Sequence, residues 1–95
     1  MAGIMIVKQR VADVARWKSV FSNPELESTR QQHGLYVVGT YLAADEPSTV
    51  IVVMEMEDLA RARGFAQSDT LAEARMKAGA VGSPDGVWYG ERSVP

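Results

Sequence analysis

The hydrophobic pattern of this chain follows the order strand, helix, strand, strand, helix, strand within 95 residues. The expected strands are rich in Val, Ile, Tyr and Thr, and the expected helices carry apolar residues three and four positions apart. This order predicts a ferredoxin-like α+β sandwich in which a four-stranded antiparallel sheet carries helices on one face. The other face is left for something else to cover, and we expect function to lie there.

The first half of the chain has clear boundary signals. A strand is expected over residues 4–11, and Asp13 can cap the helix that follows it. Ser22 and Glu25 have the spacing of a capping box around Pro24, so the helix is expected to be kinked or to restart there. Gly34 can end the helix in a left-handed conformation.

Two strands are then expected over residues 35–42 and 49–56, joined by a loop over 43–48 that is long for a tight turn. Alternation in the second strand divides its residues between two faces. One face carries Val50, Val52, Met54 and Met56, and the other carries Ile51, Val53, Glu55 and Glu57.

The second half predicts a helix after Asp58 and another over residues 71–78, with Thr70 and Glu73 as a capping box. A glycine-rich passage leads to a last strand over 87–92. Arginines on these helices are interpreted as a solvated face, as at Arg61, Arg63 and Arg75.

Composition favours a single globular domain over residues 1–95. Apolar residues make up 46% of the chain, charged residues 23%, and the net charge is −2, so neither nucleic acid nor an anionic membrane is an expected partner. The absence of cysteine excludes disulfides and thiolate chemistry. A core this small would gain from pairing with a second copy. The apolar start is interpreted as a strand and not as a signal peptide, so we expect a cytoplasmic protein.

His33 and Glu55 are the candidate bases. His33 is the only histidine and ionises near neutral pH, although its place before Gly34 is equally explained by interaction with the carbonyls of a helix end. One histidine without companion ligands does not make a zinc site, and no metal is expected. Glu55, beside apolar neighbours, would be desolvated and its pKa raised; the alternative is an ion pair with Arg10, Arg30 or Arg92.

Aromatic residues are the candidate walls of a ligand pocket. Trp17 could line it or simply pack in the core. Trp88 and Tyr89 are expected on opposite faces of the last strand, and Tyr36 and Tyr41 on opposite faces of theirs unless that strand contains a bulge.

With these residues assembled, the chain resembles the dimeric α/β-barrel superfamily, and within it small bacterial proteins close to the antibiotic biosynthesis monooxygenases and the polyketide cyclases of that fold. The resemblance is a pattern of single residues that covers nearly the whole chain. These residues are Val7, Trp17, Lys18, Phe21, Arg30, Gly34, Asp45, Pro47, Glu55, Asp58, Leu59, Ala62, Arg63, Phe65, Ser68, Leu71, Ala78, Gly79, Gly82 and Pro84.

The resemblance implies a homodimer whose two sheets face each other and close a barrel, with a small-molecule pocket either between each sheet and its helices or within the barrel. Relatives often have a histidine on the first strand where this chain has Gln9, which can bind a hydroxyl or carbonyl but cannot exchange a proton near neutral pH. Haem-degrading relatives hold iron with a histidine on the later helical segment, and residues 59–78 contain none, so haem cleavage is not expected. The reaction that we expect needs no cofactor.

Two functions are consistent with these observations. The first is a cofactor-independent enzyme that oxygenates or cyclises an aromatic or polyketide-like substrate, which requires an apolar enclosure, a base and donors for an oxyanion. The second is a non-catalytic dimer that binds a small ligand or serves as an interaction module. The expected site residues are Glu55 or His33 as base, Gln9, Tyr41 and Arg30 as donors, and Trp17 and Trp88 as walls.

Overall fold

The computed structural model describes residues 3–93, so the four terminal residues of the expected 1–95 domain lie outside it. Strands and helices follow the predicted order, with each helical region divided into two helices. The elements are β1 (Gly3–Arg10), α1 (Val14–Phe21), α2 (Pro24–Gln32), β2 (Leu35–Ala43), β3 (Glu46–Met56), α3 (Leu59–Ala66), α4 (Asp69–Lys77) and β4 (Gly86–Glu91).

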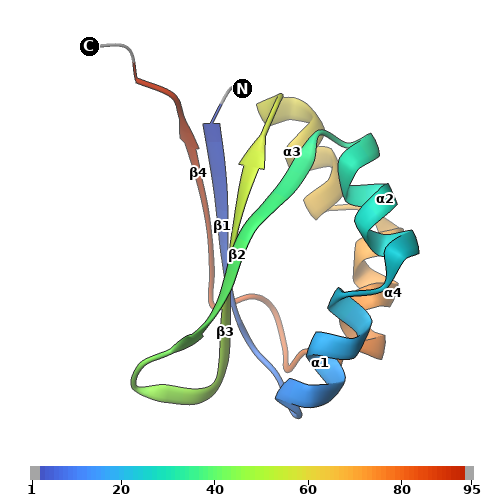
Figure 1. The fold of residues 1–95 in the computed structure, drawn as a ribbon, viewed down its shortest axis with the longest axis vertical. Helices are drawn as coiled ribbons and strands as arrows, with labels where there is room; N and C mark the ends of the chain where they lie inside the picture. The colour runs from blue at the N-terminus through green and yellow to red at the C-terminus, as the bar shows by residue number, and fades with distance from the viewer. Residues whose placement is uncertain (1–2, 94–95) are drawn as a thin grey trace.

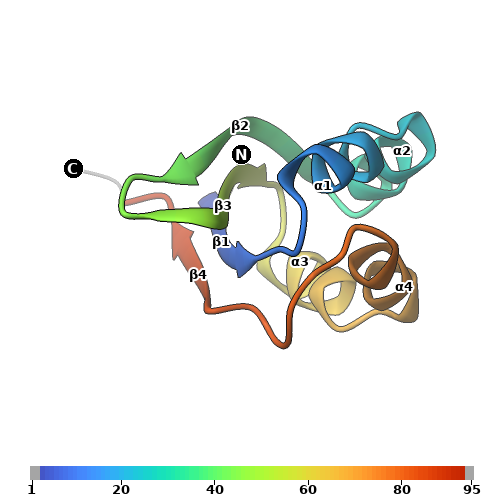
Figure 2. The same ribbon diagram turned by 90° about the horizontal axis from the view of Figure 1, so that it is seen from below.

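The four strands form one antiparallel sheet in the order β2-β3-β1-β4, which confirms the ferredoxin-like fold class. All four helices lie on one face of this sheet (Figure 1). Seen from below, α1 and α2 form one part of the helical layer and α3 and α4 the other (Figure 2). The opposite face, which we call the open face, has no element of residues 3–93 packed on it.

Two helices begin where the sequence predicts, and in both cases the sequence offers a single candidate for the N-cap residue. The Asp13 side chain accepts hydrogen bonds from the amides of Ala15 and Arg16, at 2.9 and 3.2 Å. Asp58 likewise caps α3. Each carboxylate satisfies amide donors that the first helical turn leaves unpaired.

The two expected capping boxes are wrong. The helix restarts, as one of the two alternatives predicted, but Ser22 ends α1 and Asn23 caps α2 by accepting from the Glu25 amide at 2.8 Å. Ser68, not Thr70, caps α4, with its hydroxyl accepting from the Leu71 amide at 3.2 Å. In both places a competing cap residue lies within two positions, and the chain path selects between them.

The β2–β3 connection is shorter than expected. The strands extend to Ala43 and resume at Glu46, which leaves a two-residue turn in place of the six-residue loop. Glu46 accepts a hydrogen bond from Lys8 on β1 at 2.9 Å, and this ion pair ties the hairpin end to the neighbouring strand. The pair raises the pKa of Lys8 and lowers the pKa of Glu46, chiefly through the shared hydrogen bond.

A β-bulge changes which side chains of β2 share a face. Tyr36 pairs with Glu55 and Tyr41 pairs with Ile51, but the register shifts between Val37 and Gly39. The extra residue moves the rest of the strand by one position. Tyr36 and Tyr41 therefore lie on the same face, the open one, and not on opposite faces as an unbulged strand would place them.

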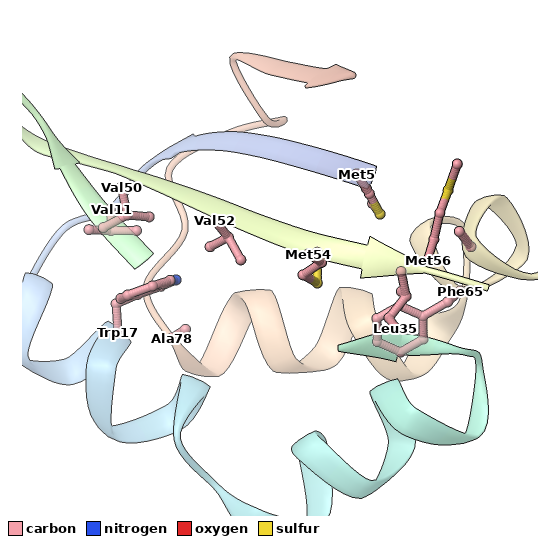
Figure 3. Packing of buried hydrophobic residues seen from close by; sticks show 11 residues of the cluster. Met5, Val11, Trp17, Leu35, Val50, Val52, Met54, Met56, Phe65 and Ala78 are labelled. Atoms are coloured by element: carbon pink, nitrogen blue, oxygen red, sulfur yellow. The ribbon is translucent and has the colours of Figure 1, made fainter. Parts of the chain in front are cut away.

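The core lies between the sheet and the helices. Met5, Val52 and Met54 point from β1 and β3 toward the helical layer, where Trp17 and Phe65 meet them (Figure 3). The alternation predicted for β3 is confirmed, because Val50, Val52, Met54 and Met56 are all buried. No helix among residues 3–93 is long and apolar enough to cross a membrane.

Candidate functional site

A cavity of about 180 Å³ lies between the sheet and the helices. Its wall is almost entirely apolar. For scale, an engineered apolar cavity of roughly 150 Å³ binds benzene, whereas pockets for drug-sized molecules span roughly 300–1,000 Å³. The cavity is thus suited to a small ring compound. It is lined by Met5, Val7, Gln9, Trp17, Val20, Phe21, Leu26, Arg30, Val50, Val52, Met54, Phe65, Ala66, Leu71, Ala74, Arg75, Ala78, Ala80, Pro84 and Val87.

Trp17 both packs in the core and lines this cavity. Its side chain comes from α1 and is 8% exposed. The ring stacks on Phe21, one helical turn later, with centroids 4.7 Å apart and planes 20° apart. The two readings of Trp17 are therefore compatible, since a well-held aromatic core residue can also form a flat wall for a ligand.

Arg30 is the buried charge of the cavity wall. It lies on α2 and is only 5% exposed. Its Nη2 donates to the carbonyl of Phe21 at 3.1 Å, and its guanidinium carbon lies 4.3 Å from the centroid of the Phe21 ring. Burial lowers the pKa of Arg30, while the nearby Glu27 carboxylate acts in the opposite direction. The guanidinium stays charged, because an arginine side chain keeps its proton throughout the physiological pH range.

Gln9 is held at the cavity wall by a side chain that the sequence did not single out. Arg75 of α4 donates from Nη2 to Gln9 Oε1 and to the carbonyl of Gly82, both at 2.7 Å. Gln9 Nε2 donates in turn to the carbonyls of Arg10 and Val81, at 2.7 and 3.2 Å. The sequence predicts that Arg75 belongs to a solvated helix face, and this prediction is wrong. Arg75 lines the cavity and holds Gln9 in place.

His33 lies at the end of α2, as its spacing predicts, and not in the cavity wall. Its Nδ1 is 2.9 Å from the carbonyl of Thr29, and its ring lies 5.0 Å from that of Phe65, centroid to centroid. The helix-end interpretation of His33 is thus supported. Because Phe65 lines the cavity, His33 stands one residue behind its wall.

Glu55, Tyr41 and Trp88 stand on the open face, away from the cavity. Glu55 is half-buried between Ile4 and Tyr36 on the neighbouring strands, and no arginine among residues 3–93 forms an ion pair with it. Tyr41 is 57% exposed and Trp88 54% exposed. Tyr89, next to Trp88 on β4, faces the core, so the two side chains lie on opposite faces of the strand as predicted.

The predicted site residues thus form two groups. Gln9, Trp17 and Arg30 meet at the cavity, and Glu55, Tyr41 and Trp88 share the open face with exposed apolar side chains. No carboxylate or imidazole lines the described cavity. Across residues 3–93, no cluster of three His, Asp or Glu side chains is placed to hold a metal ion.

An antiparallel ferredoxin-like sheet with one covered face, one open face and an apolar cavity under the helices defines a class of small α+β proteins. Comparison with solved structures places the fold among those of antibiotic biosynthesis monooxygenase-like proteins. A candidate enzyme of that name from Bordetella bronchiseptica matches with a TM-score of 0.74 and 17% identity, covering 99% of this chain and 100% of its own. Another from Caulobacter crescentus CB15 gives 0.72 and 14%, covering 98% and 91%.

The same fold also occurs in proteins without an assigned activity. A nipsnap family protein of unknown function from Agrobacterium tumefaciens matches with a TM-score of 0.65 and 11% identity, covering 97% of this chain and 88% of its own. No family model matches the sequence, and no curated protein is significantly similar to it. At these identities the likeness establishes the fold alone.

Proposed function

We propose that this protein is a cofactor-independent enzyme that oxygenates or cyclises a small aromatic or polyketide-like molecule in the cavity between sheet and helices. The observation that carries the proposal is an apolar cavity with a buried arginine in its wall. A fixed positive charge in a water-poor site stabilises an enolate or phenolate formed from the substrate. The fold shared with candidate antibiotic biosynthesis monooxygenases supports the same reaction class.

The two reactions differ in their use of oxygen. In oxygenation the substrate anion reduces O₂: one oxygen atom becomes a carbonyl oxygen at a methylene carbon, and the other leaves as water with the two methylene hydrogens. In cyclisation a carbanion of the substrate attacks a carbonyl carbon of the same molecule, and no O₂ is consumed. Both require a proton to be removed, and enclosure in the cavity would hold the reacting atoms together.

Of the two expected bases, His33 lies nearer to the cavity, because its ring contacts the wall residue Phe65. Glu55 would serve only a substrate bound on the open face. Gln9 and Arg30 are proposed to hold the substrate oxygens, and Trp17 to form a wall. Tyr41 and Trp88 would contribute only to a site inside a barrel made by two sheets.

The proposal includes a homodimer, formed in the cytoplasm, in which two open faces meet. These faces carry exposed Ile4, Tyr36, Tyr41 and Trp88, with Ile6, Ile51 and Val53 partly buried between them. An apolar sheet face of this kind is unusual on a monomer and marks an interaction surface. Two copies are the proposed occupants because each offers the same apolar face to the other.

Product formation tests the enzyme directly. The purified protein is incubated with a panel of anthrones and polyhydroxylated aromatics in air and under argon, beside a control without protein. Product only in air identifies an oxygenase, and product under both gases identifies a cyclase or isomerase. His33→Gln and Glu55→Gln variants then separate the two candidate bases. Lower turnover in His33→Gln would assign the base to the helical side of the sheet, and lower turnover in Glu55→Gln would assign it to the open face.

A second function is favoured by the absence of carboxylate and imidazole groups from the described cavity wall. A non-catalytic dimer that binds a small ligand needs no titratable group at its site. Saturable binding without turnover, and with no group titrating in the binding curve between about pH 5 and 8, would identify it.

A further inference from the structure

Arg30 has a buried donor with nothing to donate to. Its Nε is buried and has no hydrogen-bond partner within residues 3–93, although Nη2 bonds to Phe21. No carboxylate of the described residues forms an ion pair with it. A buried charge is ordinarily paired and fully hydrogen-bonded, because leaving it unpaired is costly.

The guanidinium is also held in a fixed position at the cavity. It stacks over the Phe21 ring, which in turn stacks on Trp17. Among the other polar side chains of the wall, Gln9 has partners for both its amide oxygen and its amide nitrogen, and Arg75 Nη2 donates to Gln9 and to the Gly82 carbonyl. Within the described cavity wall, Arg30 is therefore the side chain that is more than nine-tenths buried and still has an unpartnered donor.

From these contacts we propose that the cavity binds a single-ring aromatic oxyanion, a carboxylate or phenolate whose charged oxygen accepts from the Arg30 guanidinium. The ring would lie against the apolar wall beside Trp17. A volume of about 180 Å³ suits one substituted ring. The inference rests on the proposed function in placing the ligand in this cavity, and it specifies the chemical class of that ligand.

Arginine suits this task because its planar fork pairs with an oxyanion through charge-assisted hydrogen bonds. Such bonds are stronger than neutral ones, and burial strengthens them further. A ligand that differs only in lacking the charge should therefore bind at least roughly tenfold more weakly. Benzoate and benzamide form such a pair, with the same ring and nearly the same shape.

The test is a calorimetric titration of both compounds into the wild-type protein and into Arg30→Met, Arg30→Lys and Lys18→Met. Lys18 is exposed on α1 outside the cavity wall, so Lys18→Met matches the charge change of Arg30→Met. We expect benzoate to bind the wild type at least roughly tenfold more tightly than benzamide. Arg30→Met should abolish this preference, Arg30→Lys should retain part of it, and Lys18→Met should keep it whole.

The location of binding is read from the indole N–H signals in ¹⁵N-resolved NMR spectra. Benzoate should shift the signal of Trp17, which lines the cavity, and not that of Trp88 on the open face. Equal affinities for benzoate and benzamide, no detectable binding of either, or a shift at Trp88 alone would overturn the inference. If Arg30→Met does not fold, the wild-type comparison and Arg30→Lys decide the question.

The two proposals fail separately. Benzoate binding that depends on Arg30, with no turnover of any aromatic substrate, would contradict the proposed enzyme function and support the proposed oxyanion site. Wild-type turnover together with equal affinities for benzoate and benzamide would contradict the oxyanion site and support the enzyme.

Discussion

The buried charge of Arg30 has opposite effects on stability and on ligand binding. It costs stability in the free protein and would strengthen the binding of an anionic ligand. Its burial removes a charge from water without supplying an anion, while its hydrogen bond to Phe21 and its stacking on that ring return part of the cost. Replacing a buried charge by an apolar side chain of similar volume is often neutral or stabilising. A binding role therefore predicts that the free protein loses little when the charge is removed.

Arg30→Met should change the free energy of unfolding by no more than about 1 kcal/mol, because the lost Phe21 hydrogen bond is offset by relief of charge burial. Urea denaturation followed by circular dichroism measures the change. Trp17→Ala, which deletes a buried ring, serves as a positive control and should cost about 3–5 kcal/mol. A loss as large as this control at Arg30→Met would instead make Arg30 a structural cap of α1.

Single residues were predictable where one pattern determined them. Alternation placed Glu55 on the face opposite Val52 and Met54, and helical spacing placed Trp17 in the core. Arg75 was not predictable, because its partner Gln9 lies 66 positions away and a helical arginine usually faces water. The side of Tyr41 depended on a β-bulge next to Gly39, and an isolated glycine within a strand is only a weak signal of a bulge.

Among the elements, the passage between α4 and β4 forms part of the cavity wall through Ala80 and Pro84. Positive φ angles at Gly79 and Gly82 shape it, and the Val81 amide donates to the Arg10 carbonyl at 2.9 Å. Arg75 holds the passage from the helical side and Gln9 from the sheet. Together these hydrogen bonds hold this part of the cavity wall in place.

Arg75→Leu should destabilise the protein by about 1–3 kcal/mol, because it leaves the buried Gln9 carbonyl oxygen without a donor. Denaturant unfolding gives the value, and Lys77→Leu, an exposed position on the same helix, is the charge-matched control. Combining Arg75→Leu with Gln9→Leu should recover part of the loss, since both partners are then apolar. If the losses of unfolding free energy in the two single variants simply add in the double variant, the proposed coupling between Arg75 and Gln9 is contradicted.

The presence of each strand and helical region was easier to predict than the residues at which it begins and ends. Periodicity gave all the strands and both helical regions, because it averages over many residues. The caps at Asn23 and Ser68 and the two-residue turn before Glu46 depend on choices among adjacent polar residues. Such choices are settled by how the chain packs, which local sequence does not encode.

At the scale of the molecule, the two faces of the sheet have different roles. The sequence predicts function on the open face, yet the apolar cavity lies on the covered face, between sheet and helices. The open face carries exposed apolar side chains. No helix of residues 3–93 covers it (Figures 1 and 2). We therefore assign ligand binding to the cavity and dimer contact to the open face, both as proposals.

The proposed dimer predicts that a charge at the middle of the open face separates the two copies. Ile6→Lys on β1 should give a folded monomer in light scattering where the wild type gives a dimer, because a buried unpaired charge opposes association. Ala72→Lys, exposed on α4, should remain dimeric. A monomeric wild type at micromolar concentration would contradict the prediction.

The central claim is that chemistry takes place in the cavity, and turnover in a cavity-filled variant tests it most directly. Ala74 lines the cavity from α4, whereas Ala72 on the same helix is exposed. Product formation from the aromatic panel is compared for the wild type, Ala74→Phe and Ala72→Phe. We predict that Ala74→Phe abolishes turnover and Ala72→Phe preserves it. If Ala74→Phe keeps the turnover of the wild type, the reaction takes place outside the cavity and the claim is contradicted.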